Sequence, residues 1–256
     1  MVSIKSAREI EIMRKAGSIA AGALKTAGEM IVPGMTTKKI DTHIRRYIES
    51  RGGTPSFFKY RGFPANCCIS VNDEVIHGMP REDKILKDGD IVKIDVGAKF
   101  SGYHGDCANT FYCGDESRMP PEIKMLIDTT RESFHAAMKF AKAGRRIGEI
   151  SGAVQDYVER AGFSVVQEYV GHGIGKDLHE KPDIPNYVEP GKGKGMRMSE
   201  GMILAIEPMV NAGTHEVVTA DDKITIKTAD GKLSAHYEHT VLILRDGYEL
   251  LTLVQI

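Results

Sequence analysis

The sequence has little cysteine, no long apolar run and no excess of charge of either sign. Its 256 residues include 34 basic and 35 acidic side chains, which leaves a formal net charge of −1. No global electric field therefore draws the chain to nucleic acid or to a membrane surface. The longest apolar runs, such as Met202 to Ile206, are far too short to cross a bilayer. We expect a protein that binds neither nucleic acid nor membrane.

The four cysteines form no recognisable framework. Cys67 and Cys68 are adjacent, Cys107 and Cys113 stand apart, and no Cys-x-x-Cys motif occurs. Because vicinal cysteines rarely bridge each other, the sequence indicates neither a disulfide framework nor a thiolate zinc site. The first residues, Met1 to Ser6, lack the apolar core of a secretory signal. We therefore expect a reduced protein in the cytoplasm.

Two stretches of the chain read as copies of one another, and each ends in a carboxylate. Leu86–Asp95 aligns with Met198–Glu207, with glycine facing glycine and isoleucine facing isoleucine; positions 95 and 207 differ by 112. An amphipathic pattern over residues 34–52 also recurs over 144–162, at an offset of 110. Repeats in the same order and at similar offsets predict an internal duplication.

Local patterns predict helices alternating with mostly antiparallel strands. Ser6 and Glu9 have the spacing of a capping box, and apolar residues at helical spacing follow to about Ala27. Thr36 or Thr37 caps a second predicted helix, which stops near residue 52. Strands are predicted over residues 90–97, 103–112, 202–207, 223–228 and 240–244, the first two as a hairpin. The fold class is therefore α+β, a mixed α/β arrangement in two similar halves.

Four carboxylates accompany the duplicated strands. Asp95 and Glu207 end the two copies, and Asp106 and Glu238 follow them. A lone acid is usually a solvated turn residue, but four acids at duplicated positions favour a shared site. Four anions cannot share a dry pocket unless cations neutralise them. A metal centre is therefore the first hypothesis.

One histidine has a context that suits a ligand. His172 lies within Gly171–Gly175, where flanking glycines let the backbone bend and bring the imidazole to an ion. The residues around His77 resemble those around His172, so His77 is predicted to be its symmetry mate. His179 follows seven residues after His172, and spacing alone assigns no role to it. The other histidines, His236 among them, have no comparable context.

Four carboxylates with one imidazole form a hard, oxygen-rich ligand set. Shared carboxylates can bridge two divalent ions at roughly 3.5–4 Å, as in hydrolytic two-metal sites. Little nitrogen and no thiolate favour manganese, iron(II), cobalt or magnesium over structural zinc. A water held by two cations becomes hydroxide near neutral pH, which is a nucleophile for an amide carbonyl.

The chain resembles the bacterial type I methionine aminopeptidases without an N-terminal extension, within the creatinase and prolidase superfamily. The matching motifs run in family order: Val71–Gly78, Ile94–Gly97, Gly102–Asp106 with Thr110, Gly171–Gly175, His179–Glu180, Ile206–Met209 and Tyr237–Thr240. The resemblance implies the pita-bread fold, in which two pseudo-twofold halves form a curved, mostly antiparallel sheet flanked by helices. It implies a single catalytic domain over residues 1–256, with halves at about 1–120 and 121–256.

The same resemblance implies an activity and a ligand set. The enzyme would remove the initiator methionine from nascent peptides with a small second residue, using two divalent ions: cobalt, manganese, iron(II) or zinc. Asp95 would chelate one ion, Asp106 and Glu238 would bridge both, and His172 and Glu207 would complete the shell of the other. Glu207 would also relay a proton from the bridging water towards the leaving amine.

Substrate contacts follow from the resemblance too. His179 would hydrogen-bond the scissile carbonyl oxygen, and His77 the peptide nitrogen. A thioether is soft and unbranched, so aromatic and sulfur walls suit it. Many relatives carry tryptophan, phenylalanine and tyrosine at three positions of this slot, whereas this chain has no tryptophan, so we expect a wider or softer slot. Ordinary core packing is the alternative for the slot residues, which are Tyr60, Phe63, Cys68, Leu178 and Ile224.

Two other functions share the fold and stay open. Prolidases and aminopeptidase P usually carry a large N-terminal domain, which we do not expect here. A binding protein acting on RNA or ribosomes would lose metal ligands and gain basic tails, whereas this chain keeps the ligand set and a balanced charge. We expect a monomer. Transient ribosome association, the metal used in the cell and the role of the long loop at 189–197 are left open.

Overall fold

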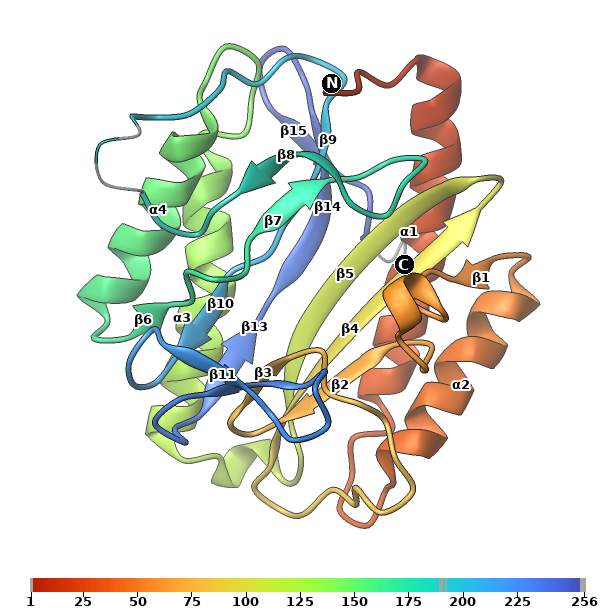
Figure 1. Cartoon of the computed structure of the whole chain (residues 1–256), viewed down its shortest axis with the longest axis vertical. Coiled ribbons are helices and arrows are strands. Elements are labelled where there is room, and N and C mark those ends of the chain that lie inside the picture. The colour runs from red at the N-terminus through yellow and green to blue at the C-terminus, as the bar shows by residue number, and fades with distance from the viewer. Residues whose placement is uncertain (1, 189–190, 192, 254–256) are drawn as a thin grey trace.

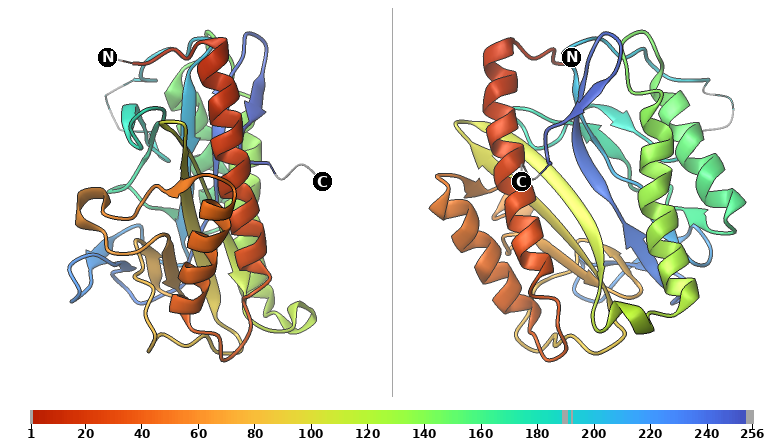
Figure 2. Two further views of the ribbon diagram at one scale, coloured as in Figure 1. Left: turned by 90° about the vertical axis from the view of Figure 1, so that its right-hand side faces the viewer. Right: turned by 180° about the vertical axis from the view of Figure 1, so that it is seen from behind.

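The computed structural model describes residues 2–188, 191 and 193–253, and its centre is a curled nine-stranded sheet. Every strand pairing in these residues is antiparallel. The α-helices lie together on one face of the sheet, while loops and short strands gather on the other (Figures 1 and 2). Within the described residues these helices are α1 (Ala7–Gly28), α2 (Thr37–Ser50), α3 (Pro121–Met138) and α4 (Ile147–Arg160).

The large sheet is built from strands of both halves of the chain. The path is β1 (Thr54–Pro55), β4 (Ile91–Phe100), β5 (Tyr103–Tyr112), β14 (Glu238–Ile243), β9 (Ile203–Ile206), β7 (Gly171–Gly173) and β8 (Glu180–Ile184). Beside this path β2 (Cys68–Val71) pairs with β4, and β15 (Tyr248–Leu250) pairs with β14. The series β2-β4-β5 from the first half meets the series β14-β9-β7 from the second half at the β5–β14 contact.

Two small sheets flank the large one. One contains β13 (Ser234–His236), β10 (Met209–Asn211) and β6 (Ser164–Val165); the other contains β11 (Val217–Thr219), β12 (Ile226–Thr228) and β3 (Glu74–Ile76). Short 3₁₀ turns, η1 (Tyr60–Gly62) and η2 (Glu116–Arg118), complete the elements. The second small sheet joins segments from both halves, so it helps to close the loop-bearing face.

Each half has its own hydrophobic core between its helices and the sheet. In the first half Ile19, Ile40 and Ile44 of the helices pack with Ile94 of β4. In the second half Leu126, Phe134 and Val154 pack with strand residues such as Ile206. Burial of side chains of this size stabilises by about 1.5–3 kcal/mol each. Helices on one face thus hold the sheet from behind and leave its other face for a site.

The predicted helix ends are confirmed in detail. Ser6 caps α1: its hydroxyl accepts from the backbone N–H of Glu9, and the Glu9 carboxylate accepts from the N–H of Ser6 at 2.8 Å. Thr36 caps α2 by accepting from the N–H of Lys39. The helix predicted over the repeat at 144–162 is α4. The sequence patterns did not predict α3, although its buried residues recur at helical spacing.

Two strand predictions need correction. The hairpin is present, but β4 continues past the predicted end at residue 97 to Phe100, so Asp95 lies in the middle of the strand. The hairpin turn has only two residues, Ser101 and Gly102, both with positive φ, and this tight turn keeps the strands paired to the tip. The predicted strand at 223–228 forms only as β12, because Asp222 accepts hydrogen bonds from the N–H groups of residues 224 and 225 and makes a turn there.

The structure also bears on the predictions for the cysteines, for membrane spans and for the long loop. All four cysteines are buried and free, and the described part of the chain contains no helix with the length and apolar character that a membrane span requires. The loop at 189–197 lies partly outside the described residues.

Gly105 provides a test of how closely α1 lies on the sheet. A Cβ at this position of β5 would lie 2.5 Å from the backbone nitrogen of Gly17 in α1, and backbone cannot move away cheaply. We expect Gly105→Ala to lower the free energy of unfolding by about 2 kcal/mol or more, measured by urea denaturation.

Gly152 is the matched control. Gly152 lies in α4, and a Cβ at this position would contact only the tip of the exposed Val188 side chain, at 3.3 Å. Because alanine has the higher helix propensity, Gly152→Ala should raise stability by about 0.5–1 kcal/mol. Equal effects of the two substitutions would show that the close α1–β5 contact does not constrain the fold.

Candidate metal centre and substrate cavity

Strand register gathers three acids on the face of the sheet that the helices leave open. Asp95 pairs with Ala108, and Ala108 pairs in turn with Glu238 on the next strand. Paired residues of an antiparallel sheet point to the same face, and so do residues two apart on one strand. Asp106, two positions before Ala108, therefore joins them. Asp106 itself pairs with Gly97, so it lies diagonal to Asp95 on the same face of the hairpin.

The remaining predicted ligands come from the other half. Glu207 follows the last residue of β9 and precedes Pro208, which favours an extended backbone. His172 pairs with Ala205, two positions before Glu207, so both side chains share a face. The Nε2 atom of His172 lies 3.6 Å from Oε1 of Glu207.

The predicted symmetry between His77 and His172 is wrong. Position 93 in the first copy corresponds to position 205 in the second, since they differ by 112. Lys93 pairs with Ser70, whereas Ala205 pairs with His172, so Ser70 is the counterpart of His172. His77 instead follows β3 with a left-handed backbone, φ 57°. It reaches the same cavity from a turn.

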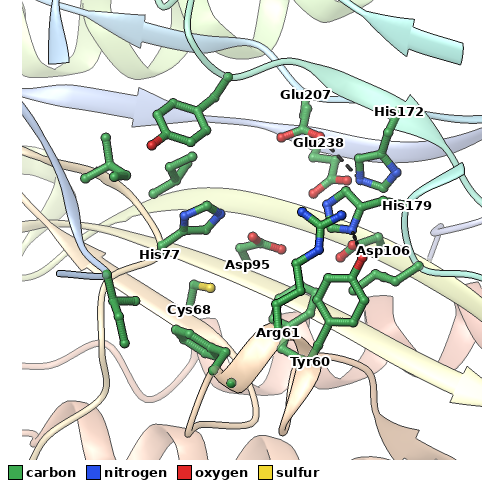
Figure 3. Close-up of a pocket in the computed structure, with 18 of the residues that line it drawn as sticks. Tyr60, Arg61, Cys68, His77, Asp95, Asp106, His172, His179, Glu207 and Glu238 are labelled. Carbon is green, nitrogen blue, oxygen red and sulfur yellow. Dashed lines mark hydrogen bonds and ion pairs between the residues drawn. The ribbon is translucent and has the colours of Figure 1, made fainter. Parts of the chain in front are cut away.

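The five predicted ligands converge in a way that fits divalent cations (Figure 3). One ligand atom each from Asp106, His172 and Glu238 lies within 4.8 Å of the others, and all three residues are buried. Two carboxylate oxygens, Oδ1 of Asp95 and Oδ1 of Asp106, are buried without any hydrogen-bond partner. An orphaned buried carboxylate oxygen is costly in a protein but suits coordination of a hard cation. The donor set therefore fits a metal.

Burial governs the protonation of the carboxylates. It raises the pKa of Asp106 from its ordinary value to about 7. Burial, reinforced by the charges of neighbouring acids, raises the pKa of Asp95, Glu207 and Glu238 well above the usual range. The carboxylates therefore retain protons near neutral pH unless a cation stabilises their charged form.

His172 is prepared as a ligand by its second ring nitrogen. Its Nδ1 lies 2.9 Å from the carbonyl oxygen of Gly173, and because a carbonyl can only accept, Nδ1 must carry the proton. Nε2 then presents a lone pair towards the carboxylates. Burial lowers the pKa of His172 to about 4, so the ring stays neutral. No proton has to leave it when a metal binds.

Two more histidines border the acids. The ring of His179 stacks on Tyr60 with centroids 5.2 Å apart, its Nδ1 lies 2.9 Å from the Tyr60 hydroxyl, and its centroid is 4.1 Å from that of His172. His179 is exposed to solvent at the cavity, and desolvation on its inner side, then the neighbouring His172 and Arg61, lower its pKa to about 3. His77 meets Tyr169 edge to face at 5.7 Å, and burial lowers its pKa too.

One cavity of about 430 Å³ includes every site residue that the sequence predicted. The acids, the three histidines and the predicted slot residues all line it. Figure 3 shows the labelled acids and histidines gathered around one space. The sequence patterns missed several lining residues: Phe57, Arg61, Gly62, Ile76, Tyr169, Thr219, Lys223 and Ile226. Arg61 lies between Tyr60 and Phe63 in the chain, so proximity to the predicted slot could have indicated it.

His236 is a further residue to which the sequence patterns assigned no role. It is buried, its Nε2 has no hydrogen-bond partner, and this atom lies 3.7 Å from Oε2 of Glu207. Burial lowers its pKa to about 3, so it approaches Glu207 as a neutral ring. His236 precedes Glu238 by two residues, and residues two apart on a strand point to the same face, so this spacing could have indicated it.

Comparison with known proteins decides the family. The model of metallopeptidase family M24 matches residues 11–245. Methionine aminopeptidase 1 of Bacillus subtilis is 48% identical over 254 residues, which span 99% of this chain and all of that protein. The chain belongs to the methionine aminopeptidases of metallopeptidase family M24. Membership of this family and the buried ligand cluster together support binding of divalent metal.

Solved structures agree with this family and fold. The methionine aminopeptidase of Thermotoga maritima has a TM-score of 0.94 at 44% identity, covering 98% of this chain and 99% of that one. A prolidase of Pyrococcus furiosus has a TM-score of 0.78 at 25% identity, covering 99% of this chain but only 66% of the prolidase. The expected pita-bread fold, with its curled antiparallel sheet and helices, is therefore confirmed.

Metal binding to this chain should release protons. The raised pKa values mean that the acids hold protons near pH 6.5, and ligation must displace them, whereas His172 is already neutral. The apparent affinity for Mn²⁺ should therefore rise as pH increases from about 6 to 8. Calorimetric titration in two buffers with different enthalpies of ionisation measures the number of protons released.

Asp106→Asn is the matched variant for this titration, because it removes one protonated carboxyl without changing the size of the side chain. It should lower both the number of protons released and the affinity. Binding of Mn²⁺ with no proton release at pH 6.5 would contradict the assignment of protonated acids to the metal-free site.

Proposed function

We propose that the chain removes the N-terminal methionine from nascent peptides with a small second residue. Asp95, Asp106, His172, Glu207 and Glu238 would hold two divalent ions: cobalt, manganese, iron(II) or zinc. The observation that carries this proposal is the buried acid cluster, with unpartnered oxygens, in the same cavity as an apolar slot. When bound, such ions lower the pKa of water to near neutrality and polarise the carbonyl of the first peptide bond.

Glu207 would act on protons as well as on the metal. Its side chain is only 13% exposed, and its pKa is raised well above the ordinary value by desolvation and by the charge of Asp106. A carboxylate in this environment takes up a proton readily and can deliver it to the leaving amine. His172 and His236 approach Glu207 from two sides as neutral rings, so neither neutralises it by forming an ion pair.

His179 would donate a hydrogen bond to the scissile carbonyl oxygen. Because its pKa is lowered to about 3, the neutral ring has one N–H, and donation from Nε2 requires Nδ1 to be an acceptor. The hydroxyl of Tyr60, 2.9 Å from Nδ1, can donate to it and so select this tautomer. Tyr60 would therefore act as a positioning residue, besides forming part of the slot wall.

His77 would contact the nitrogen of the same peptide bond. It enters the cavity from the turn after β3, and its ring is held edge to face against Tyr169. The N–H of Gly78 donates to the hydroxyl of Ser70 at 3.0 Å, which ties this turn to β2. A fixed neutral imidazole at this position can bind a peptide group without adding charge to the site.

The methionine side chain would occupy the slot formed by Tyr60, Phe63, Cys68, Leu178 and Ile224. Cys68 and Leu178 belong to one buried apolar cluster against which Tyr60 and Phe63 pack. The thiol of Cys68 stays protonated, because burial raises its pKa well above the ordinary value. A flexible, polarizable thioether suits a wall made of sulfur, aromatic and aliphatic groups.

The likeness to prolidases is weaker and covers only part of their length. At 25% identity over 66% of a prolidase chain, it supports the shared fold rather than proline-directed cleavage. We further propose that the protein acts as a monomer in the cytoplasm on chains leaving the ribosome, with transient association there. The proposed cleavage of the first peptide bond does not depend on these properties.

Peptide cleavage tests the proposed function. Protein loaded with Mn²⁺ or Co²⁺ under anaerobic conditions should release methionine from Met-Ala-Ser and should leave an Ala-Pro peptide intact. Chromatography of the reaction products measures both outcomes. Glu207→Gln keeps the shape of the side chain but removes the proton carrier, so turnover should fall below detection while the circular dichroism spectrum is unchanged. Preference for the Ala-Pro peptide, or full activity of Glu207→Gln, would refute the assignment.

Tyr60→Phe tests the tautomer argument. Loss of one hydrogen bond to Nδ1 leaves His179 free to adopt the wrong tautomer, so kcat on Met-Ala-Ser should fall by about five- to tenfold with KM nearly unchanged. His179→Ala alone should lower kcat by about 10²–10³-fold, the usual effect of removing one donor to a developing oxyanion.

The double variant provides the control for that test. If Tyr60 acts through His179, adding Tyr60→Phe to His179→Ala should produce no further loss of kcat. Multiplying effects would instead mean that the hydroxyl of Tyr60 acts independently, and the positioning role would be wrong.

A further inference from the structure

The cavity contains two cationic side chains that the proposed chemistry does not use. Arg61 and Lys223 both line it, Arg61 from the loop that carries η1 and Lys223 from the turn between β11 and β12. Both residues are exposed to solvent while their side chains border the same space as the acids. We call these two residues the cationic rim. They come from different halves of the chain, so the rim exists only in the folded cavity.

Arg61 is held close to the reacting groups. Its guanidinium lies over the ring of Tyr60, 5.4 Å from the centroid, and Figure 3 shows its side chain reaching towards His179. Its charge is among the causes that lower the pKa of His179. The backbone of Arg61 is left-handed, φ 47°, and is followed by Gly62 at φ 86°. The fold therefore tolerates backbone strain at the residue that brings this cation over the cavity.

Lys223 has a similar setting. Its backbone is also left-handed, φ 64°. The carboxylate of the neighbouring Asp222 points into the turn. It accepts hydrogen bonds there from the N–H of Ile224 and from the N–H and hydroxyl of Thr225. Neither Asp222 nor Asp221 lines the cavity. In the described part of the chain, neither Arg61 nor Lys223 forms a salt bridge with an acidic side chain.

The position of the rim favours an anionic occupant beside it. The acids that line the cavity are the four proposed metal ligands, and Arg61 and Lys223 are the arginine and lysine side chains of its described lining. Both are exposed and have no acidic partner among the described residues, so an anionic group that enters beside them can pair with either. A guanidinium binds a carboxylate through two parallel hydrogen bonds, which a lysine cannot reproduce.

We propose that the cationic rim selects nascent peptides with an acidic side chain at the third residue, immediately after the small second residue. This inference rests on the proposed function, because it takes the leaving peptide to pass the mouth of the same cavity. The methionine is held by the apolar slot and the scissile bond by His179 and His77, so the following residues must leave past the exposed side chains of the lining. An Asp or Glu there meets Arg61 or Lys223, and a Lys or Arg is repelled.

The test compares kcat/KM for Met-Ala-Asp-Ser-Ser, Met-Ala-Ser-Ser-Ser and Met-Ala-Lys-Ser-Ser at low ionic strength. The aspartate peptide should be cleaved roughly tenfold better than the lysine peptide, with the serine peptide between them, since two partly exposed charge pairs contribute a few-fold each. The ratio should shrink as salt is raised to about 0.5 M, because screening shortens the range of the rim charges.

Substitutions in the rim should change the ratio between peptides, whatever they do to the common rate. Arg61→Gln should reduce the aspartate-to-lysine ratio by about threefold, Arg61→Lys should restore part of it, and Arg61→Gln with Lys223→Gln should bring it close to one. Lys139→Glu is the control, because it changes charge at the end of α3, on the helical side of the sheet, and should leave the ratio intact.

The outcomes separate this inference from the function on which it rests. Equal cleavage of all three peptides, or an equal shift of the ratio by Lys139→Glu, would overturn the role of the rim while methionine removal stands. Failure to release methionine from the neutral serine peptide would overturn the proposed function itself. A ratio that falls stepwise with loss of each rim cation, and not with the control, supports the proposal.

Discussion

The electrostatic cost of burying four carboxylates on one face of a sheet is the constraint on which the rest of this structure depends. Two of their oxygens have no hydrogen-bond partner, and burial raises the pKa values of all four acids. Such a cluster is tolerable as neutral acids or as anions around cations, and a hydrolytic site needs the second state. A divalent metal bound there would therefore neutralise the cluster as well as supply the proposed hydrolytic chemistry.

Strand pairing fixes the positions of these carboxylates. Asp95, Asp106 and Glu238 lie on neighbouring paired strands, where the pleat sets the direction of each side chain. Behind them, the helices pack closely enough that Gly105 of β5 nearly touches the backbone of α1. A rigid sheet keeps ligand atoms where a cation can join them, which side chains on mobile loops would not do. Strands from the two halves of the chain meet at the β5–β14 pairing in the large sheet.

Much of the fold and site could be predicted, and the failures have physical reasons. Alternation along strands has a period of two, so the acids of the β4–β5 hairpin could be assigned to one face from the sequence, although their diagonal register could not. His77 reaches the cavity from a turn with positive φ, and no periodicity describes such a turn, so its supposed equivalence to His172 was wrong. The cations Arg61 and Lys223 lie in turns of the same kind. His236 and α3, by contrast, carried periodic signals that were available.

Neutral histidines and unpaired cations give the cavity a graded charge. At the acids, His172 and His236 contribute lone pairs or contacts without charge, since burial holds both rings neutral. Towards the mouth, His179 is kept neutral partly by Arg61, whose positive charge disfavours a second positive charge beside it. The same guanidinium is one of the two cationic side chains that line the cavity, and it lies over the ring of Tyr60. One exposed side chain therefore bears both on the protonation of His179 and on the selection of peptides proposed for the rim.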